Sequence, residues 1–203
     1  MSHQITTAEA LRALYPEPRE RALKKQIAAL DRHSMRFIEL SPFVVLATSG
    51  AGGTLDASPR GGAPGFVKTP DAHTLLLPDA PGNNRLDSFS NIVESGRVGL
   101  LFLIPGFDET LRVNSAALLS TDPADIARCG DEKRAPKLVI RVRVQEVYLH
   151  CAKAFMRSKL WSASSQVARA ALPTMGEMLN DQTGIQTPPE TQEEMVRRYA
   201  QDL

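Results

Sequence analysis

Short apolar and β-branched runs dominate the middle of the chain. Most of them are separated by glycine, proline, asparagine or aspartate, which is typical of strands joined by hairpins. Because closing a sheet removes its exposed edges, this pattern predicts a small antiparallel β-barrel of about six strands. The runs lie at residues 43–48, 55–58, 65–68, 74–77, 98–104, 110–119 and 138–149.

The residues before the barrel have a helical pattern. Thr6 and Glu9 have the spacing of a capping box, which predicts a helix over residues 8–14. A second helix is predicted from Pro18, since apolar residues then recur at spacings of four and three. Ser34 is expected to cap a short helical turn. The apolar residues of the second helix are Leu23, Ile27 and Leu30.

Further helices are predicted within and after the barrel. Residues 86–94 place apolar side chains on one face, with Asn84 as the expected N-cap and Gly96 as the stop. Another short helix is expected after Asp122. The C-terminal helices are predicted at residues 152–161, 174–181 and 190–201. We expect one domain over residues 1–203, with N-terminal helices (1–41), a barrel with an inserted helix (42–150) and a C-terminal helical segment (151–203).

Composition narrows the classes of function. The 24 Lys and Arg residues balance 23 Asp and Glu, so no nucleic acid partner is expected. The longest strongly apolar run, residues 98–104, is far shorter than the roughly 18 residues of a membrane span, so no membrane association is expected. The first residues resemble no secretory signal, which predicts a cytoplasmic location. Cys129 and Cys151 are expected to be reduced thiols, and no metal site is expected, because the histidines lack ligand spacing.

Two loops combine cations with turn residues. Residues 78–85 lie between a strand and a helix, where free backbone N–H groups and Arg85 favour a phosphate. Residues 58–65 hold Arg60 among glycines and prolines that leave the backbone open to a flat ligand, and Lys68 follows. The alternatives are a capped loop for the first and a glycine-rich bulge with surface charges for the second.

A third cluster lies in the C-terminal helical segment. Lys153 and Arg157 are four residues apart on one predicted helix face, where like charges repel. An anionic ligand or partner would relieve that repulsion; the alternative is a solvated face. The sequence has no GxSxG, GxxxxGK[ST] or GxGxxG motif, so hydrolase, P-loop and Rossmann functions lose their usual support.

Four segments carry a family resemblance when taken together and in order. They are residues 58–61 (SPRG), 77–79 (LPD) with 82–88 (GNNRLDS), 109–114 (ETLRVN) and 151–161 (CAKAFMRSKLW). This combination resembles the pyridoxamine 5′-phosphate oxidase-like flavoproteins, and more narrowly a bacterial branch described as FMN-dependent enzymes. The similarity spans roughly residues 37–181 and is more specific than any one motif.

The resemblance implies a mainly β fold with flanking helices: a split antiparallel β-barrel homodimer with FMN bound at the subunit interface. It also implies that basic residues of two strands and the following loop hold the phosphate and ribityl chain. The strand over residues 112–114 and the helix over residues 153–161 would reach the flavin. The implied cofactor-binding residues are Ser58, Arg60, Gly61, Lys68, Pro78, Asp79, Asn83, Asn84, Arg85, Ser88, Arg112, Asn114, Lys153, Arg157, Lys159 and Trp161.

The substrate is expected to differ from that of the oxidase. The C-terminal region lacks the Arg-x-His pattern with which pyridoxamine phosphate oxidases hold the substrate phosphate. We therefore expect an FMN-dependent oxidoreductase of another small molecule, with NADH or NADPH as the candidate electron donor. Flavin supplies the redox chemistry, and no catalytic side chain is named. The alternatives are a non-catalytic module that stores or senses FMN, and a structural dimer whose basic helix serves a protein partner.

Overall fold

Six of the seven predicted runs overlap strands of one antiparallel sheet almost fully, whereas the run over residues 65–68 contributes only Lys68 to a strand. The computed structural model describes residues 3–130, 134–185 and 187–201, so residues 1–2 and 202–203, the ends of the predicted single domain, lie outside the described residues. The order of the seven strands is β2-β1-β5-β6-β7-β4-β3. The protein is therefore mainly β with flanking helices, an architecture consistent with a split barrel. The strands are β1 (Phe43–Ser49), β2 (Leu55–Gly61), β3 (Lys68–Asp71), β4 (Thr74–Pro78), β5 (Arg97–Leu103), β6 (Thr110–Ser120) and β7 (Val139–His150).

The sheet has one strand more than the expected six, because the residues that follow the run over 65–67 also pair, as β3. β3 begins only at Lys68, since Gly65 has a φ of 80° and Phe66 closes a turn by donating its N–H to the carbonyl of Ala63. β2 extends beyond the predicted end at Ser58. It passes through Pro59, which is tolerated because β2 is an edge strand that pairs only with β1.

The chain divides into two compact units. The first comprises Met1–Ala80 and Arg85–Ala152, and the second comprises Pro81–Asn84 and Lys153–Leu203. The first unit contains the whole sheet and its hydrophobic core, which includes Leu46, Phe102 and Val142.

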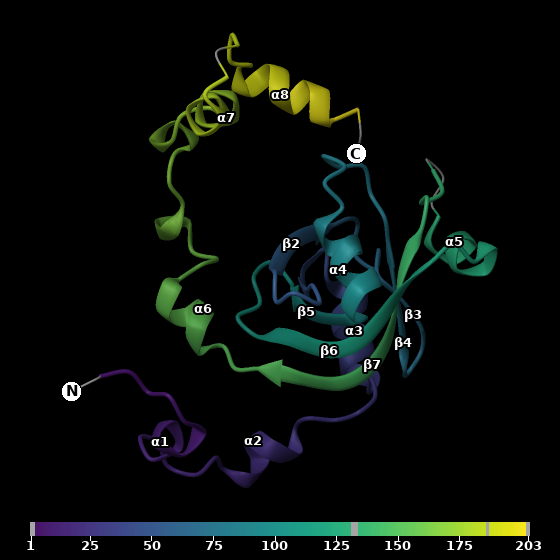
Figure 1. Cartoon of the computed structure of the whole chain (residues 1–203), viewed down its shortest axis with the longest axis vertical. Helices are drawn as coiled ribbons and strands as arrows, with labels where there is room; N and C mark the ends of the chain where they lie inside the picture. Colours follow the sequence, from purple (N-terminus) through teal and green to yellow (C-terminus); the bar gives the residue numbers. More distant parts are fainter. Residues whose placement is uncertain (1–2, 131–133, 186, 202–203) are drawn as a thin grey trace. The chain divides into compact units, whose positions relative to one another are not determined.

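The first unit also contains five helices. α1 and α2 are short, and α3 supplies Ile38 to the core. α4 supplies Ile92 and lies against β1, β2 and β6 (Figure 1), so it covers part of the core next to the edge strand. The bounds are α1 (Ala8–Arg12), α2 (Glu20–Lys24), α3 (Arg32–Leu40), α4 (Asp87–Ser95) and α5 (Pro123–Cys129).

Several predicted helix caps are wrong by a few residues. Thr7, not Thr6, caps α1, and its Oγ1 accepts the N–H of Ala10. Asp31 caps α3 by accepting the N–H of Ser34 at 2.7 Å, so Ser34 lies inside the helix that it was expected to cap. An aspartate carboxylate is among the preferred N-cap acceptors, which explains the earlier start.

The start of α4 also differs from the prediction, whereas its end agrees. The N-cap position is Leu86, which has a left-handed φ of 61° and no capping side chain, so Asn84 is not the cap. Gly96 ends the helix with a φ of 64°, as predicted. Asp122 caps α5, and Pro123 occupies its first turn.

The second predicted helix stops early because its last residues pair with the sheet. α2 ends at Lys24, and Ile27 forms an isolated antiparallel bridge with Val147 of β7. The two N–H···O distances of this bridge are 3.0 and 2.8 Å. β4 pairs with β7 only up to Arg143, which leaves the edge of β7 open for this contact. Backbone pairing at that edge therefore replaces the last part of the helix that was predicted to include Leu23, Ile27 and Leu30.

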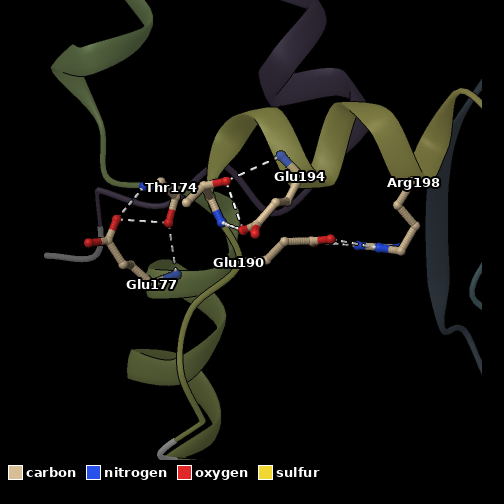
Figure 2. A network of polar contacts seen from close by, with 6 residues as sticks. Thr174, Glu177, Glu190, Glu194 and Arg198 are labelled. Atoms are coloured by element: carbon tan, nitrogen blue, oxygen red, sulfur yellow. Dashed lines mark hydrogen bonds and ion pairs between the residues drawn. The ribbon is translucent and has the colours of Figure 1, made fainter.

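The second unit consists of short helices stabilised mainly by local contacts. Thr174 and Glu177 form a capping box at α7, and Thr191 and Glu194 form one at α8. In Figure 2 these boxes lie near an ion pair in which Arg198 donates to Glu190. None of the helices of this unit contains a buried residue. They are α6 (Lys153–Ser158), two 3-10 turns (Ala163–Ser165 and Arg169–Ala171), α7 (Met175–Thr183) and α8 (Gln192–Tyr199).

Within the described parts of the chain, every helix is too short or too polar to cross a membrane. Over the same residues, no three histidine, cysteine, aspartate or glutamate side chains gather as a metal site would require.

Candidate functional site

Edge strand β2 carries three polar side chains on one face. Asp56, Ser58 and Arg60 are half-buried and alternate with exposed residues. The residues opposite them on β1 are buried. Because directly paired residues of antiparallel strands share a face, the three polar side chains point to the buried side of the sheet. This is also the side on which α4 lies.

A serine of α4 joins these side chains into one hydrogen-bonded group. Arg60 donates from Nη2 to Ser88 Oγ at 3.0 Å, and Ser88 Oγ donates to Asp56 Oδ2 at 2.5 Å. Ser58 Oγ lies 3.0 and 3.1 Å from the two carboxylate oxygens of Asp56. We call Asp56, Ser58, Arg60 and Ser88 the Arg60 group. Three of its members were predicted from the sequence, and the structure brings them together.

Asp56 is the member that sequence reasoning missed. Its signal was its place two residues before Ser58 on the same strand, which puts both side chains on one face. The carboxylate fixes both serine hydroxyls, and Ser88 in turn holds one end of the Arg60 guanidinium.

The charges near Arg60 partly offset the effect of its burial. Burial lowers the pKa of the Arg60 guanidinium, while the negative charges of Asp56 and Asp79 act in the opposite direction. Asp79 directly follows β4. Its negative charge acts on Arg60 although β2 and β4 are far apart in the strand order. One further predicted residue, Asp79, therefore lies in the electrostatic neighbourhood of Arg60.

Arg85 belongs to the same neighbourhood. It donates from Nε to Asp87 Oδ2 at 2.8 Å, and this hydrogen bond is the main cause that raises the pKa of Arg85. The charge of Asp56 acts on Arg85 as well. The carboxylate of Asp56 thus acts on two guanidinium groups, those of Arg60 and Arg85.

Lys68 does not take part in the hydrogen bonds of the Arg60 group. Its ammonium donates to the carbonyl of Gly65 at 2.8 Å. It lines an open groove of about 490 Å³ between α3 and β3, together with Arg32 and Glu39. Gly61 and Pro78, two other predicted residues, are backbone positions at the ends of β2 and β4.

Arg112 and Asn114 lie on β6 and bond across to β7. Arg112 donates from Nη1 to the hydroxyl of Tyr148 at 3.1 Å. Asn114 donates from Nδ2 to Glu146 Oε2 at 3.0 Å, next to a β-bulge in the β6–β7 pairing. Sequence reasoning named the two β6 residues but neither of their partners, because pairs that lie 32 and 36 residues apart in the chain are not visible in a local motif.

The remaining predicted residues lie in the second unit. Lys153 and Arg157 are four residues apart in α6, as predicted. The helix is shorter than expected and ends before Lys159, which has a left-handed φ of 51°. The ring of Trp161 stacks on that of Phe155 with centroids 5.7 Å apart. Asn83 and Asn84 belong to the same unit.

Comparison with known proteins identifies a protein family whose model matches this chain. The family model described as pyridoxamine 5′-phosphate oxidase matches residues 30–151. The chain matches no curated protein. A solved structure of a HupZ variant from Group A Streptococcus is 16% identical with a TM-score of 0.50, and the alignment covers 59% of this chain and 98% of that one. At this identity the similarity concerns the fold alone.

Two other solved structures align less closely. A Lactobacillus delbrueckii protein described as a candidate pyridoxamine 5′-phosphate oxidase is 18% identical, with 60% of this chain and 99% of that chain covered and a TM-score of 0.45. An FMN-binding protein from Syntrophomonas wolfei is 12% identical, with coverages of 60% and 88% and a TM-score of 0.47. The family match, by contrast, spans more than half of the 203 residues and contains both the sheet and the Arg60 group. The chain therefore belongs to the pyridoxamine 5′-phosphate oxidase family.

Proposed function

We propose that this protein binds FMN and is an FMN-dependent oxidoreductase whose substrate is a small molecule other than pyridoxamine phosphate. The observation that carries the proposal is the Arg60 group, in which a half-buried guanidinium and two serine hydroxyls converge at the edge strand of a family member. A guanidinium is the donor group that a phosphate prefers, whereas each serine hydroxyl donates its one proton to Asp56.

The donor set fits the phosphate of FMN. The guanidinium of Arg60 has five N–H donors, and its hydrogen bonds to Ser88 and to the carbonyl of Pro59 use only two of its three nitrogens. Arg85 adds a second guanidinium in the same field. Asp56 would repel a phosphate, but it also keeps the two hydroxyls and the guanidinium in place before a ligand arrives. We infer that these residues hold the phosphate end of FMN.

The rest of the cofactor would lie along residues that the family resemblance names. Arg112 and Asn114 would bind the flavin ring, with contributions from Lys153, Arg157 and Trp161. Bound flavin supplies the transfer of hydride or electrons, so the protein needs to bind and orient the reactants rather than provide a nucleophile. NADH or NADPH is the proposed electron donor.

We also propose that the protein is a homodimer with FMN at the subunit interface. The helices of the second unit bury no residue, and Met156, Leu160 and Val196 are about half-exposed or more, at 62%, 48% and 54%. Apolar helix faces of this kind usually pack against a partner surface. Light scattering on the purified protein should give twice the mass of the chain, and a monomer that still binds FMN would contradict the interface site.

The spectrum of the purified protein tests flavin binding directly. The full-length protein should be yellow, or should become so on addition of FMN. Arg60→Ala and Arg85→Ala should each weaken FMN binding by about 1.5–3 kcal/mol, the range for hydrogen bonds to charged groups. Arg143→Ala is the matched control, since Arg143 is exposed on β7 and pairs with Thr74 on β4. Unchanged affinity in both test variants would refute the phosphate site.

Reduction of the bound flavin separates an enzyme from a storage or sensing module. Anaerobic addition of NADH or NADPH should bleach the visible absorption, and an added acceptor should restore it. If neither nucleotide reduces the flavin and no acceptor is turned over, the oxidoreductase part of the proposal fails and FMN binding alone remains.

A further inference from the structure

Three side chains that can carry or donate a proton gather around one tyrosine of β7. Arg112 lies directly opposite Tyr148 in the β6–β7 register and donates to its hydroxyl at 3.1 Å. The ring of His150, two residues further along β7, lies with its centroid 5.1 Å from that of Tyr148. The ammonium of Lys25 lies 5.3 Å from the tyrosine ring centroid. We call Lys25, Arg112, Tyr148 and His150 the Tyr148 cluster.

Backbone pairing fixes the position of Lys25 in this cluster. The bridge between Ile27 and Val147 anchors the N-terminal segment to the edge of β7. Lys25 Nζ then donates to the carbonyl of Leu149 at 2.7 Å. A flexible lysine side chain is thereby held by a strand contact and by its own hydrogen bond, close to a second cation.

The charge of the cluster is positive and poorly balanced. The guanidinium carbon of Arg112 lies 5.7 Å from the Tyr148 ring centroid, so two cations share one aromatic ring. Burial is the main cause that lowers the pKa of His150, and the charges of Arg112 and Lys25 lower it further. No carboxylate is among the groups that shift the pKa of His150. Glu146, on the same strand, accepts a hydrogen bond from Asn114.

The cluster also contains an unsatisfied buried atom. Among the described residues, His150 Nε2 is buried without a hydrogen-bond partner. Tyr148 accepts a hydrogen bond from Arg112, which leaves its own hydroxyl proton available to a ligand. Buried polar groups are nearly always paired, so an orphaned nitrogen beside two cations leaves a hydrogen-bonding position open to a ligand.

We propose that the Tyr148 cluster is an oxyanion-binding site for the carboxylate or phosphate of an organic ligand. The apolar part of the ligand has a place next to the cluster. Val45, Leu101 and Arg112 follow one another in register across β1, β5 and β6, and the first two are half-buried. The assignment of the ligand as the anionic substrate of the flavoprotein rests on the proposed function, whereas the oxyanion site itself does not.

Titration of His150 by NMR tests the site in the full-length protein as purified. Inorganic phosphate and acetate are the two probes, so that the preferred oxyanion is identified. Either probe should shift the His150 resonances in a saturable way and raise the pKa of His150, since a bound anion offsets Arg112 and Lys25. Lys25→Gln and Tyr148→Phe should each weaken the binding of the probe about tenfold.

Lys24→Gln is the matched control. Lys24 is the neighbouring lysine, exposed and paired with Glu20 at 2.5 Å, so its loss removes the same charge without touching the cluster. It should bind the probes like the wild type. Equal affinities of the Lys24 and Lys25 variants, or no response of His150 to either probe, would overturn the proposal.

A second titration separates this site from the flavin site. Although the proposed function also assigns Arg112 to the flavin ring, Lys25, Tyr148 and His150 are not among the proposed flavin contacts, so phosphate or acetate should still shift His150 in protein saturated with FMN. If FMN abolishes the response, the cluster belongs to the cofactor and the inference is wrong. If the protein binds no FMN but His150 still responds to the probes, the proposed function fails while the oxyanion site stands. Circular dichroism of each variant confirms that it is folded.

Discussion

Asp56 shows what a single residue can add to a predicted site. The family resemblance named Arg60, Ser58 and Ser88, whose basic and hydroxyl groups are typical phosphate ligands. Asp56 has the wrong charge for such a ligand, so ligand chemistry alone does not select it. Only the strand alternation and the approach of α4 reveal that it organises the other three.

The two cysteines differ sharply in their surroundings. Cys129 is buried, and burial is the main cause that raises the pKa of its thiol to about 11. Cys151 is exposed. Only the thiolate reacts with thiol reagents, so at pH 8 the ionised fraction of Cys129 is on the order of one in a thousand.

We therefore predict that one thiol per chain reacts rapidly with a chromogenic disulfide at pH 8. Cys151→Ser should abolish the rapid phase and Cys129→Ser should leave it intact, as measured by absorbance in the stopped flow. In denaturant both thiols should react. A rapid phase that survives Cys151→Ser would show that the region around Cys129 opens readily.

At the scale of the elements, chain-local signals predicted the strands well. β-rich runs and turn residues placed six of the seven strands, all except β3, and Gly96 and Asp122 marked helix boundaries correctly. Errors arose where a nearby residue offered a better contact. Asp31 rather than Ser34 caps α3. Ile27 pairs with the open edge of β7 instead of continuing its predicted helix. Competition between a local helix and a distant strand edge cannot be read from periodicity.

The Asp31 cap predicts a specific dependence of stability on pH. The N–H of Ser34, bonded to the carboxylate, is the main cause that lowers the pKa of Asp31. A carboxyl group whose pKa is lower in the folded state stabilises that state above its unfolded pKa of about 3.9. This contribution is lost as the pH falls through the folded pKa.

Asp31→Ala should cost about 1 kcal/mol at pH 7, the usual value of an N-cap, and much less at pH 2. Urea unfolding at both pH values measures the difference. Asp31→Asn is the control, because asparagine also caps helices but carries no charge. A cost of Asp31→Ala that is the same at both pH values would refute the role of the carboxylate.

On the scale of the whole molecule, the site could be predicted only in part. Three predicted residues, Ser58, Arg60 and Ser88, do lie together in the Arg60 group. Lys68 was expected to join them, yet its ammonium is bonded to Gly65 next to α3. Tyr148 and Glu146 were missed because their contacts depend on the bulged β6–β7 register.

The two units predict how a shortened chain behaves. A chain that ends at Ala152 loses α6, α7 and α8, which contain no buried residue. Its thermal unfolding should stay cooperative, with a midpoint within about 4 °C of the full chain, which corresponds to roughly 1 kcal/mol. FMN affinity should fall, because the proposed flavin contacts from Lys153 to Trp161 are removed. Loss of a cooperative transition would show that the barrel needs the C-terminal helices.

The bridge from Ile27 to Val147 has one more consequence. Exposed strand edges recruit strands from other molecules and so promote aggregation. The N-terminal segment occupies part of such an edge, and Leu30 adds a hydrogen bond to the carbonyl of Ala72 in the β3–β4 turn. A proteolytic cut that released residues 1–30 would leave the Arg60 group in place, yet it would remove Lys25 and open this edge of β7 to pairing with a strand of another molecule.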